Sequence, residues 1–275
     1  MTTAPTRRER QRQATYDEIV EVSRRLLRDG DDVSIRAVAT AMGLTPPALY
    51  RYVDSHAELL ALVAQSVFED VVASMGVARD AQAPDDPAAQ IVAAATAFRH
   101  WAMTHRQEFQ LVFASATPAD AGAGVVAVVG APTGSTPEGS TNTWAALHGC
   151  APVQSGADLF AAFFGEIFGR LWERYRFPVP ADSDLDPEVL AVLRSQITPS
   201  TVTDGLGAAT PGMIWMFERA WAKLYGTVTL EVFGHVHPVF ISSGALFRAA
   251  MLDIGRELTI DTEWDRLQDV ARGLL

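Results

Sequence analysis

The chain has 275 residues, of which 48% are hydrophobic, and this length and composition suit one or two domains with a substantial core. The net charge of -11 argues against a general nucleic-acid coating protein, and no stretch approaches the ~20 uninterrupted apolar residues of a membrane helix. The single cysteine, Cys150, excludes an intramolecular disulfide and a cysteine-based metal cluster, and no apolar segment follows the N-terminal arginines to make a signal peptide, so we expect a soluble cytoplasmic protein that does not contact a membrane.

The charge is distributed unevenly along the chain. Residues 1–60 hold nine basic and nine acidic residues, so the whole net charge falls on the remaining 215 residues. The start of this neutral segment is locally basic, because four arginines there are opposed by one glutamate: Arg7, Arg8, Arg10 and Arg12 against Glu9. A basic end on an acidic body can bind DNA while the body repels misplaced contacts.

Apolar residues recur at spacings of three and four along most of the chain, whereas alternating strand patterns are scarce, so we expect an all-α protein. Gly30 and Gly43 mark two helix ends, since glycine tolerates the left-handed conformation of a helix cap. The N-terminal part predicts helices over residues 8–28, 34–42, 47–53 and 55–75.

The sequence Thr45-Pro46-Pro47 stands at the start of the third predicted helix. The first backbone N–H groups of a helix have no partner within it, so prolines there remove no internal hydrogen bond. We expect the Thr45 hydroxyl to cap this helix by accepting from the N–H group of Ala48. Helix, glycine turn and helix over residues 34–53 then form a helix-turn-helix, whose second helix enters the DNA major groove.

The rest of the chain predicts further helices after a linker at residues 76–88. Residues 117–156 are rich in Ala, Gly, Pro, Thr and Ser and carry almost no charge, which predicts a long flexible insertion. The predicted helices cover residues 87–104, a short segment with Phe109 and Phe113, residues 158–176, a segment that opens at Asp186, and residues 211–234, 243–258 and 262–275.

Residues 14–60 resemble the DNA-binding domain of the tetracycline-repressor (TetR) family. The resemblance lies in SIRAVA at 34–39, MGLT at 42–45, ALYRYV at 48–53 and the following Ser55-His56-x-Glu58-Leu59. It implies a dimeric regulator with an N-terminal three-helix domain that contains the helix-turn-helix. We therefore expect a DNA-binding domain over residues 1–54 and a helical ligand-binding and dimerisation domain over residues 55–275.

The same resemblance indicates which residues contact DNA. Tyr50 matches the tyrosine that typically holds a phosphate in the family, with packing as the alternative, and His56 stands where the family often has lysine. The prolines can offer only apolar contacts, for example to thymine methyl groups, so we expect a large share of shape readout. The predicted DNA-binding residues are Arg36, Thr45, Pro46, Pro47, Ala48, Tyr50, Arg51, Tyr52 and His56.

A second resemblance lies in the C-terminal half. Residues 98–113 and 220–235 resemble the C-terminal domain of a TetR subgroup named for a Trp-His-Gly pattern. Trp221, Tyr225 and Gly226 make the match. Because tyrosine stands where the subgroup often has histidine, no role of that histidine is transferred to this chain.

Aromatic residues predict a mainly apolar ligand pocket in the C-terminal domain. Thirteen Phe and six Trp exceed what packing requires, although an aromatic residue at helical spacing is more often ordinary core. His100 or His105 could anchor a ligand, with a structural histidine as the alternative. The predicted ligand-binding residues are Phe98, Trp101, His105, Phe109, Phe113, Phe160, Phe164, Phe168, Trp172, Phe217 and Trp221.

Three motifs do not support their usual function, and we expect no metal and no cofactor. Residues 122–127 mimic a dinucleotide fingerprint without the preceding strand. Residues 182–186 have the aspartate spacing of a calcium loop, but Pro187 occupies the position of the required glycine. His235 and His237 have no cysteine or acidic partners nearby, and we expect them to cap the C-terminal end of a helix.

These patterns together predict a transcriptional repressor that a small apolar or aromatic effector releases from a near-palindromic operator in double-stranded DNA. As in the family, two copies would pair through residues 211–236 and 243–258. The chain shows no catalytic constellation, so we expect no enzyme activity. The alternatives are an activator or a ligand-independent regulator on the same fold and, from another class, a small-molecule carrier or enzyme.

Overall fold

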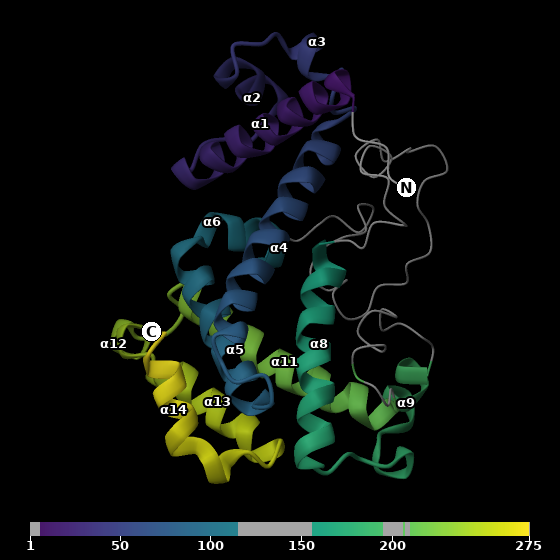
Figure 1. The fold of residues 1–275 in the computed structure, drawn as a ribbon, viewed down its shortest axis with the longest axis vertical. Helices are drawn as coiled ribbons and strands as arrows, with labels where there is room; N and C mark the ends of the chain where they lie inside the picture. Colours follow the sequence, from purple (N-terminus) through teal and green to yellow (C-terminus); the bar gives the residue numbers. More distant parts are fainter. Residues whose placement is uncertain (1–5, 115–155, 195–205, 207–209, 275) are drawn as a thin grey trace.

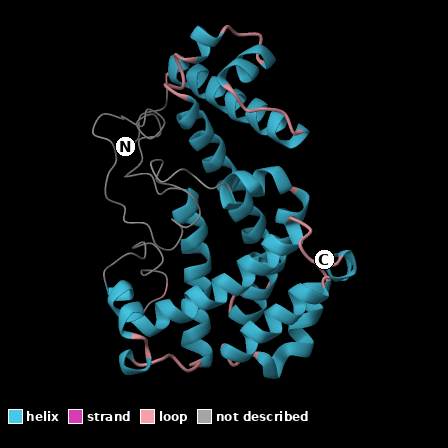
Figure 2. Ribbon diagram, turned by 180° about the vertical axis from the view of Figure 1, so that it is seen from behind, coloured by secondary structure: helices cyan, strands magenta, loops and turns pink. Residues whose placement is uncertain are grey.

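The computed structural model describes residues 6–114, 156–194, 206 and 210–274. Every regular element within these ranges is a helix, which confirms the predicted all-α class (Figure 2). The predicted insertion at 117–156 lies outside the described residues except for Gly156, and so does the glycine-rich stretch at 122–127.

The first three helices form a compact unit at one end of the molecule (Figure 1). They are α1 (Arg7–Asp29), α2 (Ile35–Ala41) and α3 (Pro46–Leu49), and the long α4 (His56–Asp80) leads from them into the rest of the chain. Ser34 caps α2 by accepting from the N–H group of Ala37 at 3.2 Å, and Ser55 caps α4 by accepting from Glu58 at 3.1 Å. Gly30 ends α1 at a φ of 80°, as the sequence predicts.

A small aliphatic core holds these helices together. Val38, Ala39 and Leu49 are completely buried and pack against Ile19 of α1, which confirms the helix-turn-helix packing. The helix α3 is shorter than the predicted 47–53, and the predicted hydroxyl cap of Thr45 is wrong. Because two prolines supply no N–H group, the first donors are the backbones of Ala48 and the next residue, and the carbonyl of Thr45 accepts both, at 2.9 and 3.2 Å.

The remaining helices form a second, larger body around the lower half of α4 (Figure 1). The helix α4 continues to Asp80, into the predicted linker. The predicted helix at 243–258 matches α13 (Ala245–Glu257), and Gly244, which has a φ of 61°, separates it from α12 (Pro238–Ser243), which the sequence did not predict. Apart from short 3-10 turns, this body consists of α5 (Pro87–Thr104), α6 (Arg106–Phe109), a π-helical turn (Gln110–Ala114), α8 (Gly156–Tyr175), α9 (Pro187–Arg194), α11 (Pro211–Val232), α12 (Pro238–Ser243), α13 (Ala245–Glu257) and α14 (Trp264–Arg272).

The helix α4 is long and apolar enough by composition to cross a membrane. In the structure it packs against α5 and α8, with Val63, Val67, Val71 and Met75 completely buried in the core of the larger body. These buried side chains account for part of its apolar composition, since 28% of its most apolar stretch is buried.

A buried ion pair connects α5, α11 and α12 in the larger body. The Nε atom of Arg99 on α5 lies 2.5 Å from the Oε2 atom of Glu231 on α11, and the Glu231 side chain is completely buried. The Arg99 Nη2 atom also donates to the carbonyl of Ile241 on α12 at 2.8 Å. The pair thereby holds three helices at one point, so its loss would leave a charge buried without a partner.

Candidate functional site

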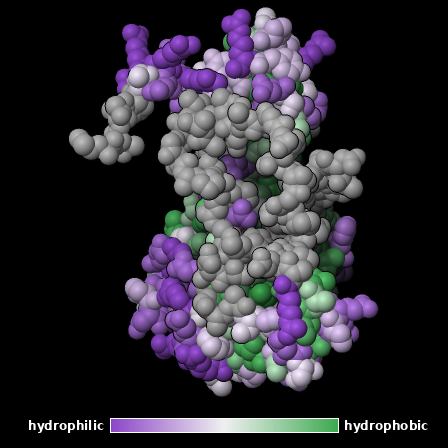
Figure 3. Space-filling view, turned by 90° about the vertical axis from the view of Figure 1, so that its right-hand side faces the viewer, coloured by the Kyte–Doolittle hydropathy of each residue, from purple (hydrophilic) through white to green (hydrophobic). Residues whose placement is uncertain are grey.

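The outer face of the helix-turn-helix carries most of the predicted DNA-binding residues. Figure 3 shows that hydrophilic side chains cover the end of the molecule formed by the N-terminal helices. Six of the nine predicted residues are exposed: Arg36, Thr45, Pro47, Tyr50, Arg51 and His56. The other three are half-buried: Pro46, Ala48 and Tyr52. One side of α2 and α3 is thus completely buried against α1, and the opposite side is open to a partner.

Tyr50 is the most accessible aromatic residue of this face. Its side chain is 50% exposed, and it has no hydrogen bond or ring contact within the described part of the chain. The hydroxyl is therefore free to donate to a phosphate oxygen, a contact that positions a protein on DNA.

Tyr52 and His56 have structural partners that the sequence does not reveal. The ring of Tyr52 packs edge-on against Tyr16 at 5.7 Å, and the Tyr16 hydroxyl donates to the Tyr52 carbonyl at 2.9 Å. The His56 Nε2 atom lies 2.7 Å from the carbonyl of Val33, so this nitrogen must hold a proton to donate. His56 could then contact DNA only through its Nδ1 atom. Tyr52 could contact DNA only through the exposed part of its ring.

Most of the predicted ligand-binding residues pack against one another in the larger body. Phe98 of α5 lies at the centre, with ring centroids 5.3 Å from Phe160, 5.4 Å from Phe113 and 5.9 Å from Trp221. We call this group the aromatic core; its members are Phe98, Phe109, Phe113, Phe160, Phe164, Phe168, Phe217 and Trp221. Tyr225 is one of the three residues that match the Trp-His-Gly subgroup, and its hydroxyl donates to the carbonyl of Phe113 at 2.5 Å.

A small apolar hollow lies at the edge of the aromatic core. Its volume is about 40 Å³, and Phe164, Phe168, Phe217 and Trp221 of the predicted set line it together with residues of α5, α11 and α13. Ligand pockets for drug-sized molecules are roughly 300–1,000 Å³. A ligand larger than a few atoms would therefore have to separate the aromatic side chains.

Three residues of the predicted set lie away from the centre of the aromatic core. Trp172 is half-buried near the end of α8, where the Arg176 guanidinium covers its ring at 4.4 Å. Trp101 and His105 stack on each other at 4.9 Å beside α4 and α6. The structure therefore places His105 among polar groups and not against the hollow.

The polar side chains near His105 connect α1 of the N-terminal unit to α4 and α6. Arg24 of α1 donates through Nε to Glu108 of α6 at 2.7 Å and through Nη2 to Asp70 of α4 at 2.8 Å. The Nη1 atom of Arg28 lies 3.3 Å from the same Glu108 oxygen, and Trp101 donates to Asp70 at 3.1 Å. We call Arg24, Asp70 and Glu108 the Arg24 clamp.

Charge decides how the clamp is held. The Glu108 side chain is completely buried, and its Oε2 atom has no hydrogen-bond partner among the described residues, so the arginines at Oε1 supply its compensation. Burial alone would raise the pKa of Asp70, but the hydrogen bonds from Arg24 and Trp101 outweigh burial and lower that pKa. The ion pair between Arg24 of α1 and Asp70 of α4 is thus formed at neutral pH.

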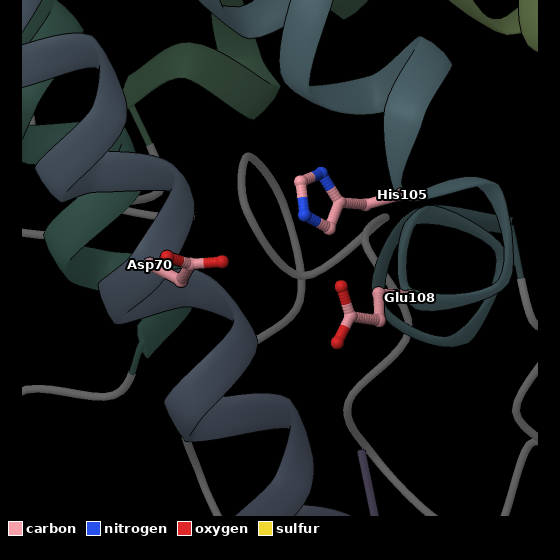
Figure 4. Close-up of side chains that lie close together, drawn as sticks. All are labelled: Asp70, His105 and Glu108. Carbon is pink, nitrogen blue, oxygen red and sulfur yellow. The ribbon is translucent and has the colours of Figure 1, made fainter. Parts of the chain in front are cut away.

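The clamp region also offers atoms of the kind that bind metals. Figure 4 shows Asp70, His105 and Glu108 converging from α4 and from the corner between α5 and α6, with candidate ligand atoms within 4.8 Å of one another. The guanidinium of Arg24 bonds both carboxylates, so a cation is already present there. The sequence shows nothing of this cluster, because Asp70 lies more than thirty residues before His105 and Glu108.

The motifs set aside in the sequence have local structural roles. Asp182 pairs with Arg194 at 2.6 Å, and Asp186 caps α9 by accepting from Glu188 at 2.8 Å. His237 begins α12 and its Nδ1 atom accepts from the backbone of the second residue after it, which corrects the predicted C-terminal cap. Pro238 at the first helical position explains the correction, since proline favours a helix start.

Comparison with known proteins identifies the family. A family model described as the tetracyclin repressor-like C-terminal domain matches residues 91–254. The HTH-type transcriptional regulators Mb1846 of Mycobacterium bovis and Rv1816 of Mycobacterium tuberculosis are each 36% identical over 102 residues, which cover 36% of this chain. The match spans 44% of the length of these curated relatives.

A solved structure shares the fold. The crystal structure of SCO4313, titled as a regulatory protein, superposes with a TM-score of 0.55 and 21% identity, over 90% of this chain and 98% of that one. At this identity the likeness shows the fold alone. It extends over both the N-terminal helices and the larger body, and so supports their common arrangement.

Proposed function

The chain belongs to the tetracycline-repressor (TetR) family of helix-turn-helix transcriptional regulators, and on this premise we propose that it is a repressor that a small apolar ligand releases from a specific operator. The observation that supports DNA reading most directly is the two-sided helix-turn-helix. Val38 and Leu49 are completely buried, while Arg36, Tyr50 and Arg51 are exposed on the other side. Residues 1–54 would form the DNA-binding domain.

Affinity and sequence choice would come from different residues of this face. Arg36, Tyr50 and Arg51 would contact phosphates or base edges, which supply affinity and register. Pro46 and Pro47 would meet only apolar groups in the major groove, since neither has an N–H group. We therefore propose that much of the specificity is read through DNA shape.

We propose that two copies assemble through α11 and α13, within residues 211–236 and 243–258. These helices contact each other, and exposed apolar side chains lie at this end of the body: Leu230 of α11 is 42% exposed and Phe240 of α12 is 50% exposed. Pairing would place two recognition helices in successive major grooves, about 34 Å apart, on a near-palindromic site.

The effector would bind in the aromatic core of the domain over residues 55–275. The core is apolar, and its hollow of about 40 Å³ shows where packing is incomplete. A ligand that widened it would displace α4, which runs from the core to the helix-turn-helix, and so change the distance between the two recognition helices.

The test is an in vitro selection of random duplex DNA by the purified chain at two salt concentrations. The proposal expects a near-palindromic consensus with half-sites one or more helical turns apart. Binding that is salt-sensitive but blind to sequence would contradict it. A size measurement that gave a monomer at micromolar concentration would contradict the pairing.

Activation instead of repression is the second candidate on the same fold. A reporter gene placed behind the selected site would decide between them. Repression predicts lower output when the protein is present, and higher output would establish an activator.

A further inference from the structure

Neighbouring residues of α6 contact different parts of the molecule. Glu108 points toward α1 and bonds Arg24, whereas the next residue, Phe109, is completely buried in the aromatic core. The ring of Phe109 stacks on Phe113 of the π-helical turn at 4.9 Å and lies 6.2 Å from Phe98. One short element therefore contacts both the proposed ligand site and the DNA-binding helices.

We infer that Glu108 is a positioning residue that transmits the state of the aromatic core to α1 through the Arg24 clamp. A shift of α6 would move Glu108 away from Arg24, and α1 would lose its fixed angle to the body. The inference rests on the proposed function and adds a second route from core to DNA, beside the one through α4.

The clamp depends on a few hydrogen bonds centred on Arg24. Arg24 is 13% exposed and uses three of its donors at once, to Glu108, Asp70 and, at 3.3 Å, the hydroxyl of Ser66. Glu108 has no other described partners than Arg24 and Arg28, so a small displacement would leave a buried carboxylate unpaired. An unpaired buried carboxylate is costly, so the clamp opposes displacement of α6 from α1.

The clamp spans the two hydrophobic cores and is not part of either. Arg24 and Arg28 lie on α1. Asp70 lies midway along α4 and Glu108 lies on α6, as Figure 4 shows. Breaking it would therefore leave both cores packed while loosening the angle between them. Since dimeric DNA binding needs a fixed spacing, the loosened protein would bind its operator more weakly.

The experiment uses the full chain and the duplex recovered by selection with the wild type. Operator Kd is measured by fluorescence anisotropy, and backbone hydrogen exchange of α1 is measured on the free protein. The variants are E108Q, R24K and the double variant. R24K keeps the charge but lacks the planar fork that reaches two carboxylates. Glu263→Gln is the matched control, because Glu263 bonds Tyr175 at 2.8 Å and does not contact α1.

We expect E108Q and R24K each to raise the operator Kd about tenfold, within the usual range of coupling between sites. Exchange of α1 amides should quicken, with α5 and α8 protected as in the wild type. Because both variants break the same clamp, the operator Kd of the double variant should not exceed the higher of the two single-variant Kd values. Glu263→Gln should match the wild type in both measurements.

The inference is overturned if folded E108Q or R24K keeps the wild-type Kd and the wild-type exchange of α1. Additive effects in the double variant would also overturn it, since they would show independent roles. If E108Q fails to fold, R24K gives the same test from the α1 side. A wild type that selects no sequence defeats the proposed function instead, while the exchange of α1 still decides whether the clamp fixes this helix.

Discussion

The two ends of α4 enter cores of different kinds. At the upper end, Val38, Leu49 and their neighbours form a small aliphatic core that leaves the other side of the helix-turn-helix exposed. At the lower end, a larger core combines aliphatic residues with a cluster of aromatic rings and leaves only a small hollow, of about 40 Å³, at the edge of the cluster. The first region is built to present side chains to a partner, whereas the second can respond to a ligand only by repacking.

The largest effect should come from the buried ion pair of the larger body. Arg99→Met would leave the completely buried Glu231 without its partner, at a cost of about 3–5 kcal/mol in the free energy of unfolding. Chemical denaturation measures this cost. The control is Arg194→Met, whose exposed pair with Asp182 should contribute less than about 1 kcal/mol. Equal effects of the two variants would show that burial does not separate these pairs.

The second effect is a dependence of the free energy of unfolding on pH, caused by Glu218 of α11. Burial raises the pKa of Glu218 to about 7, above its ordinary value of 4.5. The folded state then binds the proton more tightly, so the free energy of unfolding should fall by about 3 kcal/mol as pH rises from 4.5 to 7. Glu218→Gln should remove this decline. Parallel stability curves for the wild type and the variant would contradict the assignment.

The third effect should appear in DNA affinity alone. Tyr50→Phe removes a hydroxyl that has no described partner in the protein, so the free energy of unfolding should stay within about 0.5 kcal/mol of the wild type. Operator affinity should fall by about 1.5 kcal/mol, as expected for a lost hydrogen bond to a charged group. Calorimetry and anisotropy measure the two quantities. An unchanged Kd would mean that Tyr50 does not hold a phosphate.

The smallest effect is a difference in stability between substitutions at the two residues that precede α2 and α3. Ser34→Ala removes an observed cap and should cost about 1 kcal/mol of stability. Thr45→Val removes a hydroxyl that makes no cap bond and should change stability by less than about 0.5 kcal/mol. Thermal unfolding compares them. A larger loss for Thr45→Val would restore the hydroxyl cap predicted from the sequence.

Sequence reasoning succeeded where signals are local. Caps, glycine ends and apolar spacing predicted α1, α2 and the start of α4 closely, because each depends on residues within one or two turns. Composition also predicted an aromatic interior. It could not show that the rings fill each other's space, since ring contacts such as that of Phe98 with Trp221 join residues more than a hundred positions apart.

The clamp could not be predicted for the same reason. Arg24, Asp70 and Glu108 come from three segments, and each alone has the pattern of a solvated charged face. His105 was predicted as a polar anchor for a ligand because it lies with His100 on one predicted helical stretch. In the structure it follows the end of α5 and lies beside Asp70 and Glu108 of the clamp. Long-range charge pairing has no local pattern to indicate it.

The central claim is that the exposed face of α2 and α3 reads a specific DNA sequence. The most direct measurement compares the Kd of the wild type for the selected duplex with its Kd for a scrambled duplex of the same length and composition. We expect a preference of roughly a thousandfold or more for the selected duplex at physiological salt. Equal affinities that fall together as salt rises would contradict it.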